Sequence, residues 1–289
     1  MSYQNLYLQE SGKIMKLVES DKPNAKLFGV PFDSTSSFRV GSKFAPHEIR
    51  VAFNNLEIYS RIFDVNLEKY YIEDLGDVSA SCDARVVSKQ VSNLWKELIT
   101  KEVPICMLGG EHSISYGSIS ALPEDVGIVV FDAHLDLREE LNGSDFTHAT
   151  FLRRLLEIVD RRRFIHVGSR AACAQEWEYV KEKDLRIIEQ DCYKATVLSK
   201  NNFFRKYKNI YVSVDMDVFD PAFAPGIGNP EPCGLSPKDF LDFLRNLRGN
   251  RIVGFDIVEV CPPYDNGNTS ILAAKLILEI LSYCHLIKH

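Results

Sequence analysis

The sequence lacks the cysteine patterns of disulfide-rich proteins and of zinc–thiolate proteins. Its seven cysteines are odd in number and scattered, and no two of them form a C-x-x-C pair. A disulfide framework uses an even set of cysteines, and a thiolate zinc site uses clustered ones. Both are therefore disfavoured, and reduced thiols in an intracellular protein are the simplest expectation.

Three further absences narrow the class of protein. The net charge is -6 and the pI is near 5.7, so there is no basic footprint of the kind that binds nucleic acid. No stretch reaches the roughly 18 consecutive apolar residues of a membrane helix. Residues 1–20 are too polar for the core of a signal peptide. We therefore expect a cytoplasmic protein that binds neither nucleic acid nor membranes.

What is present is a regular alternation of strand-like and helix-like segments. Apolar runs rich in β-branched residues predict strands, and helical spacing with capping residues predicts the segments between them. The strands are expected at 26–30, 70–72, 104–108, 127–131, 164–167, 185–188, 210–214 and 251–255. The helices are expected at 86–101, in a short segment from Ser113, and at 148–159, 174–181, 236–247 and 269–287. This pattern favours a three-layer α/β/α fold with a central, mainly parallel sheet of about eight strands.

The chain shows no Pro/Gly-rich linker and no internal repeat. We therefore expect a single domain over residues 21–289. Residues 1–20 carry little pattern and are expected to form an N-terminal tail that can be mobile.

The strand at 127–131 ends in a polar triplet, Asp132, His134 and Asp136. Side chains alternate across a strand with period two, so the three project to one side if the strand geometry continues past Phe131. Ligands of open α/β sheets bind outside the carboxyl ends of the strands. The triplet is either part of such a site or a solvated strand end, and only partners elsewhere in the chain decide between them.

Candidate partners follow two other predicted strands. The run at 210–214 ends in Asp215 and Asp217, and the run at 104–108 is followed by two glycines and His112. Four carboxylates in one crevice repel strongly unless cations lie between them. If these strands are neighbours in the sheet, the residues form a metal site; if they lie far apart, the acids never meet.

Four segments of the chain resemble the arginase/agmatinase (ureohydrolase) family, namely 109–113, 132–136, 213–217 and 256–260. They stand in the family's order and at its spacing, and the likeness extends from about Leu27 to the C-terminal helix. The resemblance implies an arginase-like fold with a metal site at the strand ends. It also implies a hydrolase that acts on a small cationic guanidino substrate, with 21–289 as its catalytic domain.

The resemblance further implies a cofactor of two Mn²⁺ ions per subunit. One ion would take His112, Asp132, Asp136 and Asp215, and the other Asp132, His134, Asp215 and Asp217, so that Asp132 and Asp215 bridge them. The residue types agree independently, because hard carboxylate oxygens and imidazoles without thiolates suit Mn²⁺. In the resembled family a hydroxide between the two ions attacks the guanidinium carbon. Asp136 would orient that hydroxide.

Two further residues take their roles from the resemblance. Glu259 would position the guanidinium, and His148 would shuttle a proton to the leaving amine. A histidine titrates near neutrality, as such a shuttle requires. Many relatives have glycine after this histidine, where this chain has Ala149. The alternative is a solvated histidine at a helix start.

Three departures from arginases concern the substrate's tail. Arg138, Phe146 and Cys173 stand where arginases place polar residues that recognise the amino-acid head group, so arginase activity is disfavoured. The segments 31–39, 224–226, 230–232 and 137–140 resemble the agmatinase branch, which implies conversion of agmatine to putrescine and urea. Candidates for the acid that meets the distal amine of agmatine are Glu139, Asp145 and Glu176. Arg39 and Asp33 are expected to order their loop rather than to catalyse.

Other interpretations stay open at this point. Arg138 near the mouth of the site could instead favour a carboxylate-tailed guanidine such as guanidinobutyrate. A protein of this fold kept for binding or assembly would have lost a metal ligand, the shuttle histidine or the guanidinium-binding glutamate, and this chain has lost none of them. By resemblance only, we expect a homo-oligomer, either a trimer or a hexamer.

Overall fold

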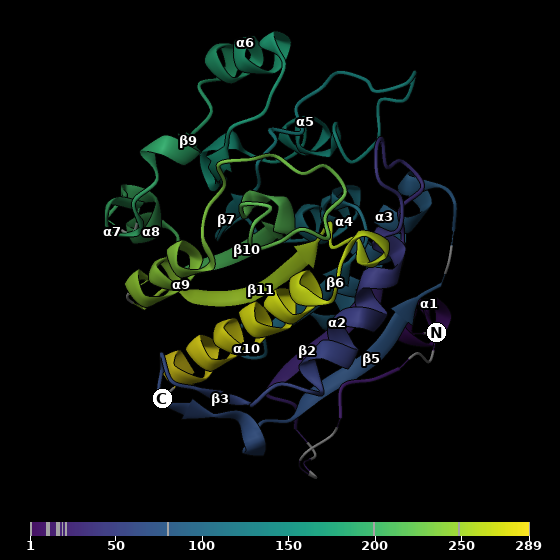
Figure 1. The fold of residues 1–289 in the computed structure, drawn as a ribbon, viewed down its shortest axis with the longest axis vertical. Coiled ribbons are helices and arrows are strands. Elements are labelled where there is room, and N and C mark those ends of the chain that lie inside the picture. The colour runs from purple at the N-terminus through teal and green to yellow at the C-terminus, as the bar shows by residue number, and fades with distance from the viewer. Residues whose placement is uncertain are drawn as a thin grey trace.

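The computed structural model describes residues 2–9, 12–15, 18, 20, 22–79, 81–198, 200–247 and 249–288. Its centre is a nine-stranded sheet in the order β1-β5-β2-β6-β11-β10-β7-β8-β9 (Figure 1). In that order the strands are β1 (Leu8–Gln9), β5 (Ile72–Val78), β2 (Ala25–Val30), β6 (Ile105–Gly109), β11 (Arg251–Val258), β10 (Asn209–Asp215), β7 (Val126–Phe131), β8 (Phe164–Ser169) and β9 (Ile187–Glu189). Neighbours pair in parallel except β1, which is antiparallel to β5.

The eight predicted strands all correspond to strands of this sheet, with boundaries that differ most for β5 and β9. The ninth strand, β1, comes from the predicted N-terminal tail, and its Leu8 lies opposite Val78 at the sheet edge. A separate two-stranded sheet, β3 (Tyr59–Ser60) with β4 (Val65–Asn66), carries too little pattern to have been predicted. The division of the chain at residue 20 stays a prediction.

Helices cover both faces of the sheet, which confirms the three-layer α/β/α arrangement (Figure 1). One face packs against α2 (Ala45–Phe53), α7 (Ala195–Leu198), α8 (Asn202–Lys206), α9 (Pro237–Asn246) and α10 (Asn268–Lys288). The other packs against α3 (Ala84–Leu98), α4 (Ser115–Ser120), α5 (Phe151–Leu156) and α6 (Ala174–Lys183). The predicted helix at 148–159 is therefore shorter than expected. Helix α2 was not predicted.

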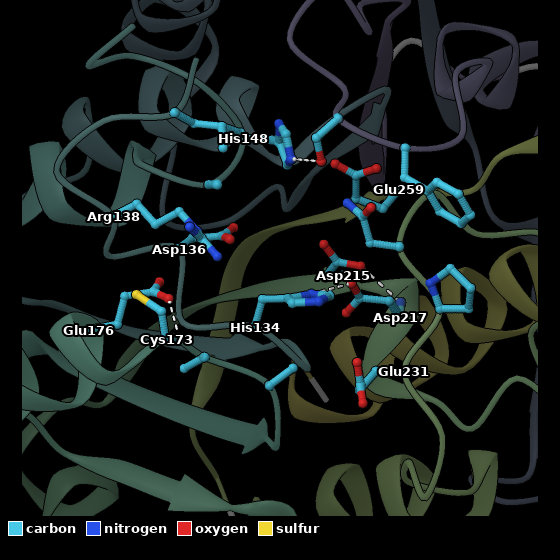
Figure 2. A pocket seen from close by; sticks show the side chains of 18 residues that line it. His134, Asp136, Arg138, His148, Cys173, Glu176, Asp215, Asp217, Glu231 and Glu259 are labelled. Atoms are coloured by element: carbon cyan, nitrogen blue, oxygen red, sulfur yellow. Dashed lines mark hydrogen bonds and ion pairs between the residues drawn. The ribbon is translucent and has the colours of Figure 1, made fainter. Parts of the chain in front are cut away.

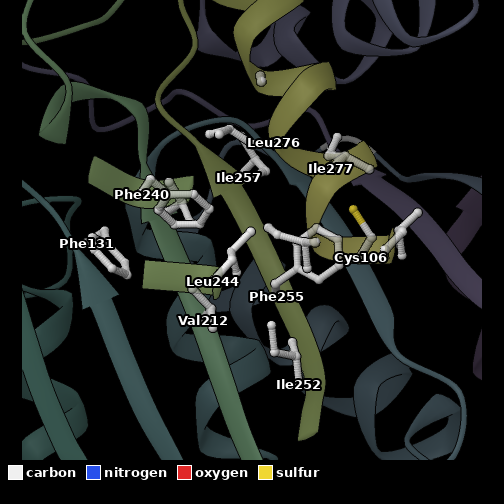
Figure 3. Close-up of a cluster of buried hydrophobic side chains, with 14 of the residues drawn as sticks. Cys106, Phe131, Val212, Phe240, Leu244, Ile252, Phe255, Ile257, Leu276 and Ile277 are labelled. Atoms are coloured by element: carbon white, nitrogen blue, oxygen red, sulfur yellow. The ribbon is translucent and has the colours of Figure 1, made fainter. Parts of the chain in front are cut away.

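Helix α10 lies along the sheet and supplies much of one core. Phe255 and Ile257 of β11 share that core with Leu276 and Ile277 of α10 (Figure 3). Residues Asn268–Ile287 are long and apolar enough to cross a membrane, yet 67% of the most apolar 18-residue window is buried inside the protein. Its apolar character is that of a core helix, which needs apolar side chains around most of its circumference.

The strand order decides where the candidate residues meet. Strands β6, β11, β10 and β7 are consecutive neighbours and run parallel, so their carboxyl ends lie at one edge of the sheet. The chain leaves these four ends through His112, Glu259, Asp215 and Asp132 respectively. The condition that the acidic strand ends must be close together is therefore met.

Candidate metal centre

Asp132, His134 and Asp136 converge although the strand before them has ended. Strand β7 stops at Phe131, and Asp136 takes a left-handed backbone conformation with φ of 52°. That conformation costs a residue other than glycine about 1–2 kcal/mol. It leaves Asp136 Oδ2 3.5 Å from Nδ1 of His112, while Asp132 Oδ2 lies 3.0 Å from the same nitrogen. The triplet thus reaches one site through a turn, and not by continuing the strand as expected.

Asp215 and Asp217 join this cluster from the next strand. Asp215 ends β10, and a single 3-10 turn (Met216–Val218) carries Asp217 toward the end of β7. The Asp217 backbone amide donates to Asp215 Oδ1 at 2.8 Å, and the Ala133 amide donates to Asp217 Oδ1 at 3.0 Å. The second carboxylate oxygen of Asp217 lies 2.8 Å from His134 Nδ1. Backbone amides therefore hold both acids in place.

The ligand atoms fall into two groups that share one residue. His112, Asp132 and Asp215 form the first, and Asp132, His134 and Asp217 form the second; within each, one ligand atom per residue lies within 4.8 Å of the others. In the first group His112 Nδ1 is 3.0 Å from Asp132 and 3.1 Å from Asp215. Asp132 thus lies where a carboxylate would bridge two cations, and Asp215 belongs only to the first group.

The donor set fits cations on physical grounds. His112 Nδ1 is buried without a hydrogen-bond partner and faces the carboxylates of Asp132 and Asp215. A buried nitrogen of this kind needs a ligand, because an unpaired polar atom in the interior is costly. Oxygen and imidazole donors, with no thiolate among them, suit hard divalent ions such as Mn²⁺.

The pKa values of the clustered acids reflect their burial and the repulsion between neighbouring carboxylates. Burial and the neighbouring Asp132 raise the pKa of Asp136, and burial with Asp217 raises the pKa of Asp215. His134 is different, because the Asp217 carboxylate outweighs burial and raises the pKa of His134 to about 9. Divalent cations among these groups would offset the repulsion that raises the carboxyl pKa values.

A buried hydroxyl network holds the His112 ring from behind. His112 Nε2 lies 3.0 Å from Ser213 Oγ, which in turn donates to Asp256 Oδ1 at 2.6 Å. Asp256 is fully buried, and its other oxygen accepts from Tyr211 at 2.5 Å and Ser115 at 2.9 Å. Since the Ser213 hydrogen goes to Asp256, Ser213 accepts from His112 Nε2–H. Nδ1 then keeps its lone pair toward the carboxylates.

Glu259 closes the site from the end of β11. It is buried and takes a left-handed conformation with φ of 62°. Its Oε1 accepts from the His112 backbone amide at 2.8 Å, and its side chain lines the cavity described below. Burial and the nearby Glu111 raise the pKa of Glu259.

His148 lies across the site and is buried, so it is not the solvated residue of the alternative interpretation. Its ring is between two hydroxyls, with Nδ1 3.3 Å from Thr35 Oγ1 and Nε2 3.2 Å from Ser37 Oγ. Burial and the charge of His134 lower the pKa of His148 to about 4. This differs from the near-neutral value we expected and makes His148 a neutral imidazole at pH 7.

A cavity of about 570 Å³ is lined by six of the predicted side chains, those of His134, Asp136, His148, Asp215, Asp217 and Glu259 (Figure 2). In this view His134, Asp215 and Asp217 lie near the centre, with His148 and Glu259 above them. The cavity is also lined by Phe38, Arg138, Leu141, Cys173, Glu176, Asn229, Pro230 and Glu231. The predicted residues are therefore brought together around one hollow of a size suited to a small molecule.

Only some of the residues considered for contact with the substrate's tail line the cavity. Arg138 and Cys173 line the cavity, whereas Phe146 is buried against Tyr116 and does not. Asp145 forms a surface ion pair with Arg85 instead of facing the cavity.

Two other acids proposed for that contact are also occupied elsewhere or exposed. Glu176 lines the cavity, but its two oxygens accept from the backbone amides of Leu137 and Cys173. Glu139 is exposed and lies 3.7 Å from Arg153. Arg39 donates to the carbonyls of Pro225 and Ile227, which agrees with a loop-ordering role.

A sequence profile described as the arginase family matches residues 23–282, which is most of the chain. The chain belongs to the arginase family.

Relatives of this arginase-family enzyme include an agmatinase from Halalkalibacterium halodurans, 35% identical over 281 residues that cover 94% of this chain and 96% of the relative. An N(1)-aminopropylagmatine ureohydrolase from Thermococcus kodakarensis is 34% identical over 278 residues, with coverage of 94% and 95%. The crystal structure of the agmatine ureohydrolase of Thermoplasma volcanium superposes with a TM-score of 0.87 and 38% identity, covering 96% of this chain and 95% of that one.

The cavity of this arginase-family enzyme also contains residues that sequence reasoning missed. Ser37 and Glu231 lie in segments whose likeness to the agmatinase branch was noted, but nothing in their type or spacing marked them as site residues. Asn229 lay outside every motif. Thr35 and Glu111, which contact or support His148, lie in the resembling segments 31–39 and 109–113, but no role was assigned to either of them.

Proposed function

We propose that this enzyme is a binuclear Mn²⁺ ureohydrolase that splits agmatine into putrescine and urea. The observation that carries the proposal is the pair of three-residue ligand groups that share Asp132, beside a buried Glu259 in one cavity. A guanidinium carbon is a poor electrophile because its charge is delocalised. The site must therefore supply a strong nucleophile at neutral pH. Two neighbouring cations that share a bound water are a known means of doing so.

We propose that one ion is held by His112, Asp132, Asp136 and Asp215, and the other by Asp132, His134, Asp215 and Asp217. When bound, two such ions would lower the pKa of a water between them and so supply the nucleophile. The four aspartates carry four negative charges, which two divalent cations balance. Asp136, whose Oδ2 lies 3.5 Å from His112 Nδ1 and outside both closest groups, would accept a hydrogen bond from the attacking water.

We assign guanidinium binding to Glu259. Its Oε1 is already taken by the His112 amide, so Oε2 is the oxygen available to accept from a guanidinium N–H. Burial strengthens a charge-assisted hydrogen bond of this kind, because no water competes for either partner. Glu259 would thereby hold the guanidinium carbon of the substrate close to Asp132, the residue that the two ligand groups share.

We assign proton delivery to His148. The neutral ring can take a proton at Nε2 from the attacking water and pass it to the nitrogen of the leaving amine. Its lowered pKa means that the protonated ring gives up its proton more readily than an ordinary imidazolium does. Collapse of the tetrahedral carbon then releases urea and the amine.

Agmatine is favoured as the substrate by the agmatinase and aminopropylagmatine ureohydrolase relatives and by the lack of an amino-acid head-group site. Among the acids along the cavity, Glu231 has no hydrogen bond or ion pair to its carboxylate in the described contacts, so it is the acid best placed to meet a distal amine. We propose Glu231 for this contact in place of Asp145 and Glu176, because the carboxylates of those two residues already have partners in the protein.

A second candidate substrate class is a guanidino acid such as guanidinobutyrate. Arg138 favours it, because this exposed guanidinium lines the mouth of the cavity and makes no ion pair within the described residues. A carboxylate tail would pair with it directly.

A substrate panel tests these proposals. Mn²⁺-loaded protein is given agmatine, N(1)-aminopropylagmatine, arginine, guanidinobutyrate and guanidinopropionate, and urea is measured. We expect the highest kcat/KM with agmatine. Preference for guanidinobutyrate would support the second candidate, preference for arginine would refute the head-group reasoning, and no urea from any guanidine with both ions bound would refute the catalytic assignment.

We further propose that residues 21–289 are the catalytic domain, that the enzyme works in the cytoplasm in polyamine synthesis, and that it assembles as a homo-oligomer, a trimer or hexamer. These proposals follow from the family and from the product, a diamine. Light scattering of the purified protein gives the subunit number directly.

A further inference from the structure

The His148 ring is held by a residue that no metal or substrate role accounts for. Thr35 Oγ1 lies 3.0 Å from the His148 backbone nitrogen and 3.3 Å from ring Nδ1. The same hydroxyl lies 2.5 Å from Glu111 Oε1, and the Thr35 amide donates to Glu111 Oε2 at 2.7 Å. Thr35 is thus fixed at two points by one buried carboxylate.

The hydrogens of this cluster can be counted. Glu111 accepts from Thr35 and, at 2.5 Å, from Ser113, so the single Thr35 hydroxyl hydrogen is directed at Glu111. The Thr35 oxygen is then left with its lone pairs alone. One accepts the His148 backbone N–H, and the other can be satisfied by ring Nδ1 only if Nδ1 carries the hydrogen.

We propose that Thr35, anchored by Glu111, is a positioning residue that fixes His148 in the Nδ1–H form and leaves Nε2 as its reactive nitrogen. Ser37 Oγ lies 3.2 Å from Nε2 and lines the cavity, so this nitrogen faces the hollow. The inference rests on the proposed role of His148 as proton carrier and deepens it by naming the nitrogen that works.

The chemistry follows from this tautomer. Nε2 takes a proton from the attacking water, which gives a ring protonated at both nitrogens. The Nε2–H bond then breaks as its proton moves to the leaving amine nitrogen, where a new N–H bond forms. The ring returns to the Nδ1–H form, since the Nδ1 hydrogen stays on the ring and remains hydrogen-bonded to Thr35 Oγ1 throughout. With the opposite tautomer, Nε2 would already carry a hydrogen and could not accept one.

The direct test is the tautomer of His148 in the full-length chain. Correlation of the ring nitrogens with the ring carbon-bound hydrogens by NMR distinguishes the two tautomers, and metal-free protein is used because Mn²⁺ broadens the signals. The His148 signal is assigned by its loss in His148→Asn. We expect wild type and Thr35→Ser to show Nδ1–H, and Thr35→Val to show Nε2–H or a mixture.

Kinetics of the Mn²⁺-loaded protein with agmatine provide the second readout. Thr35→Val should lower kcat by about tenfold or more while KM and bound Mn²⁺ stay unchanged, because only proton transfer is impaired. Thr35→Ser should restore kcat. Thr100→Val is the matched control, since Thr100 is exposed, does not line the cavity, and its hydroxyl accepts a hydrogen bond from the Val103 amide.

Glu111→Gln keeps the inference testable if Thr35→Val does not fold. The amide nitrogen can direct a hydrogen at Thr35, which frees the Thr35 hydroxyl to donate to His148, so the tautomer should become mixed. An Nε2–H ring in wild type, or an unchanged tautomer in both variants, would overturn the inference. Failure of the proposed function is a different result, because urea would then be absent while the NMR outcome stood as expected.

Discussion

Replacing Asp256 with asparagine tests how the metal ligand His112 is prepared for its cation. Asp256 is fully buried and accepts hydroxyl hydrogens from Ser213 on one oxygen and from Tyr211 and Ser115 on the other. An asparagine keeps the shape but has one oxygen. If the asparagine oxygen accepts from Tyr211 and Ser115, the asparagine NH₂ group faces Ser213.

The consequence reaches the metal site through one hydroxyl. Ser213 would now accept from the amide and donate to His112 Nε2, which moves the ring hydrogen to Nδ1, the nitrogen 3.0 Å from Asp132 and 3.1 Å from Asp215. A metal ion would have to displace that hydrogen. Loss of such outer support typically costs 10- to 100-fold in metal affinity, or about 1.4–2.8 kcal/mol.

The assay is a competition titration of Mn²⁺ against a fluorescent chelator, with metal-free protein at pH 7.5. Asp191→Asn serves as the control, because Asp191 is exposed in a 3-10 turn away from the cavity. In Asp256→Asn we expect the affinity for one of the two Mn²⁺ ions of each chain to fall by 10- to 100-fold, while the affinity for the second ion is little changed. Equal affinities in wild type and variant, with the fold intact by circular dichroism, would refute the reasoning about Ser213.

Four other predictions concern single groups. Asp215→Ala removes a proposed ligand of both cations and should lose bound Mn²⁺ and essentially all urea release; retained metal and rate, by elemental analysis and assay, would contradict the assignment. His148→Ala should lower kcat by about 10²–10⁴-fold with metal content unchanged, and an unaltered kcat would remove His148 from the mechanism. Because the pKa of His134 is raised to about 9, a cation must displace its proton below that pH, so Mn²⁺ affinity should rise with pH and level off above about 9; a flat profile by titration would count against this. Arg50 is buried with ion pairs to Asp74 and Asp77, so Arg50→Leu should lower the free energy of unfolding in urea by about 3–5 kcal/mol, and a loss below about 1 kcal/mol would argue that water reaches the acids.

Much of the fold is readable from sequence because the central strands are continuous apolar runs. Buried parallel strands such as β7 and β10 need apolar side chains on both faces, which makes them stand out. Strand β1 and helix α2 do not stand out, since two residues at a sheet edge and a nine-residue helix carry little periodicity. Helix α9 was found with its start correct because Ser236 is a typical N-cap residue and Pro237 fits the first turn. In the structure Ser236 and Asp239 also cap the helix reciprocally.

The candidate site was predictable to the extent that it uses strand ends. Asp132 and Asp215 directly follow predicted strands, so whether they lie close together depends only on the order of the strands in the sheet. The second layer was not predictable, because it depends on loops whose course no periodicity reveals. Thr35 lies 113 residues from His148 in sequence, and Ser213 lies 101 residues from His112. The pKa of His148 was mispredicted for the same reason, since its burial was unknown.

The central claim is that Asp132 joins two cations at the carboxyl ends of the sheet. Anomalous diffraction at the manganese edge, from crystals grown with Mn²⁺, tests it most directly. The account predicts two peaks per chain, one among His112, Asp132 and Asp215 and the other among Asp132, His134 and Asp217. A single peak, or two peaks that do not both contact Asp132, would contradict it.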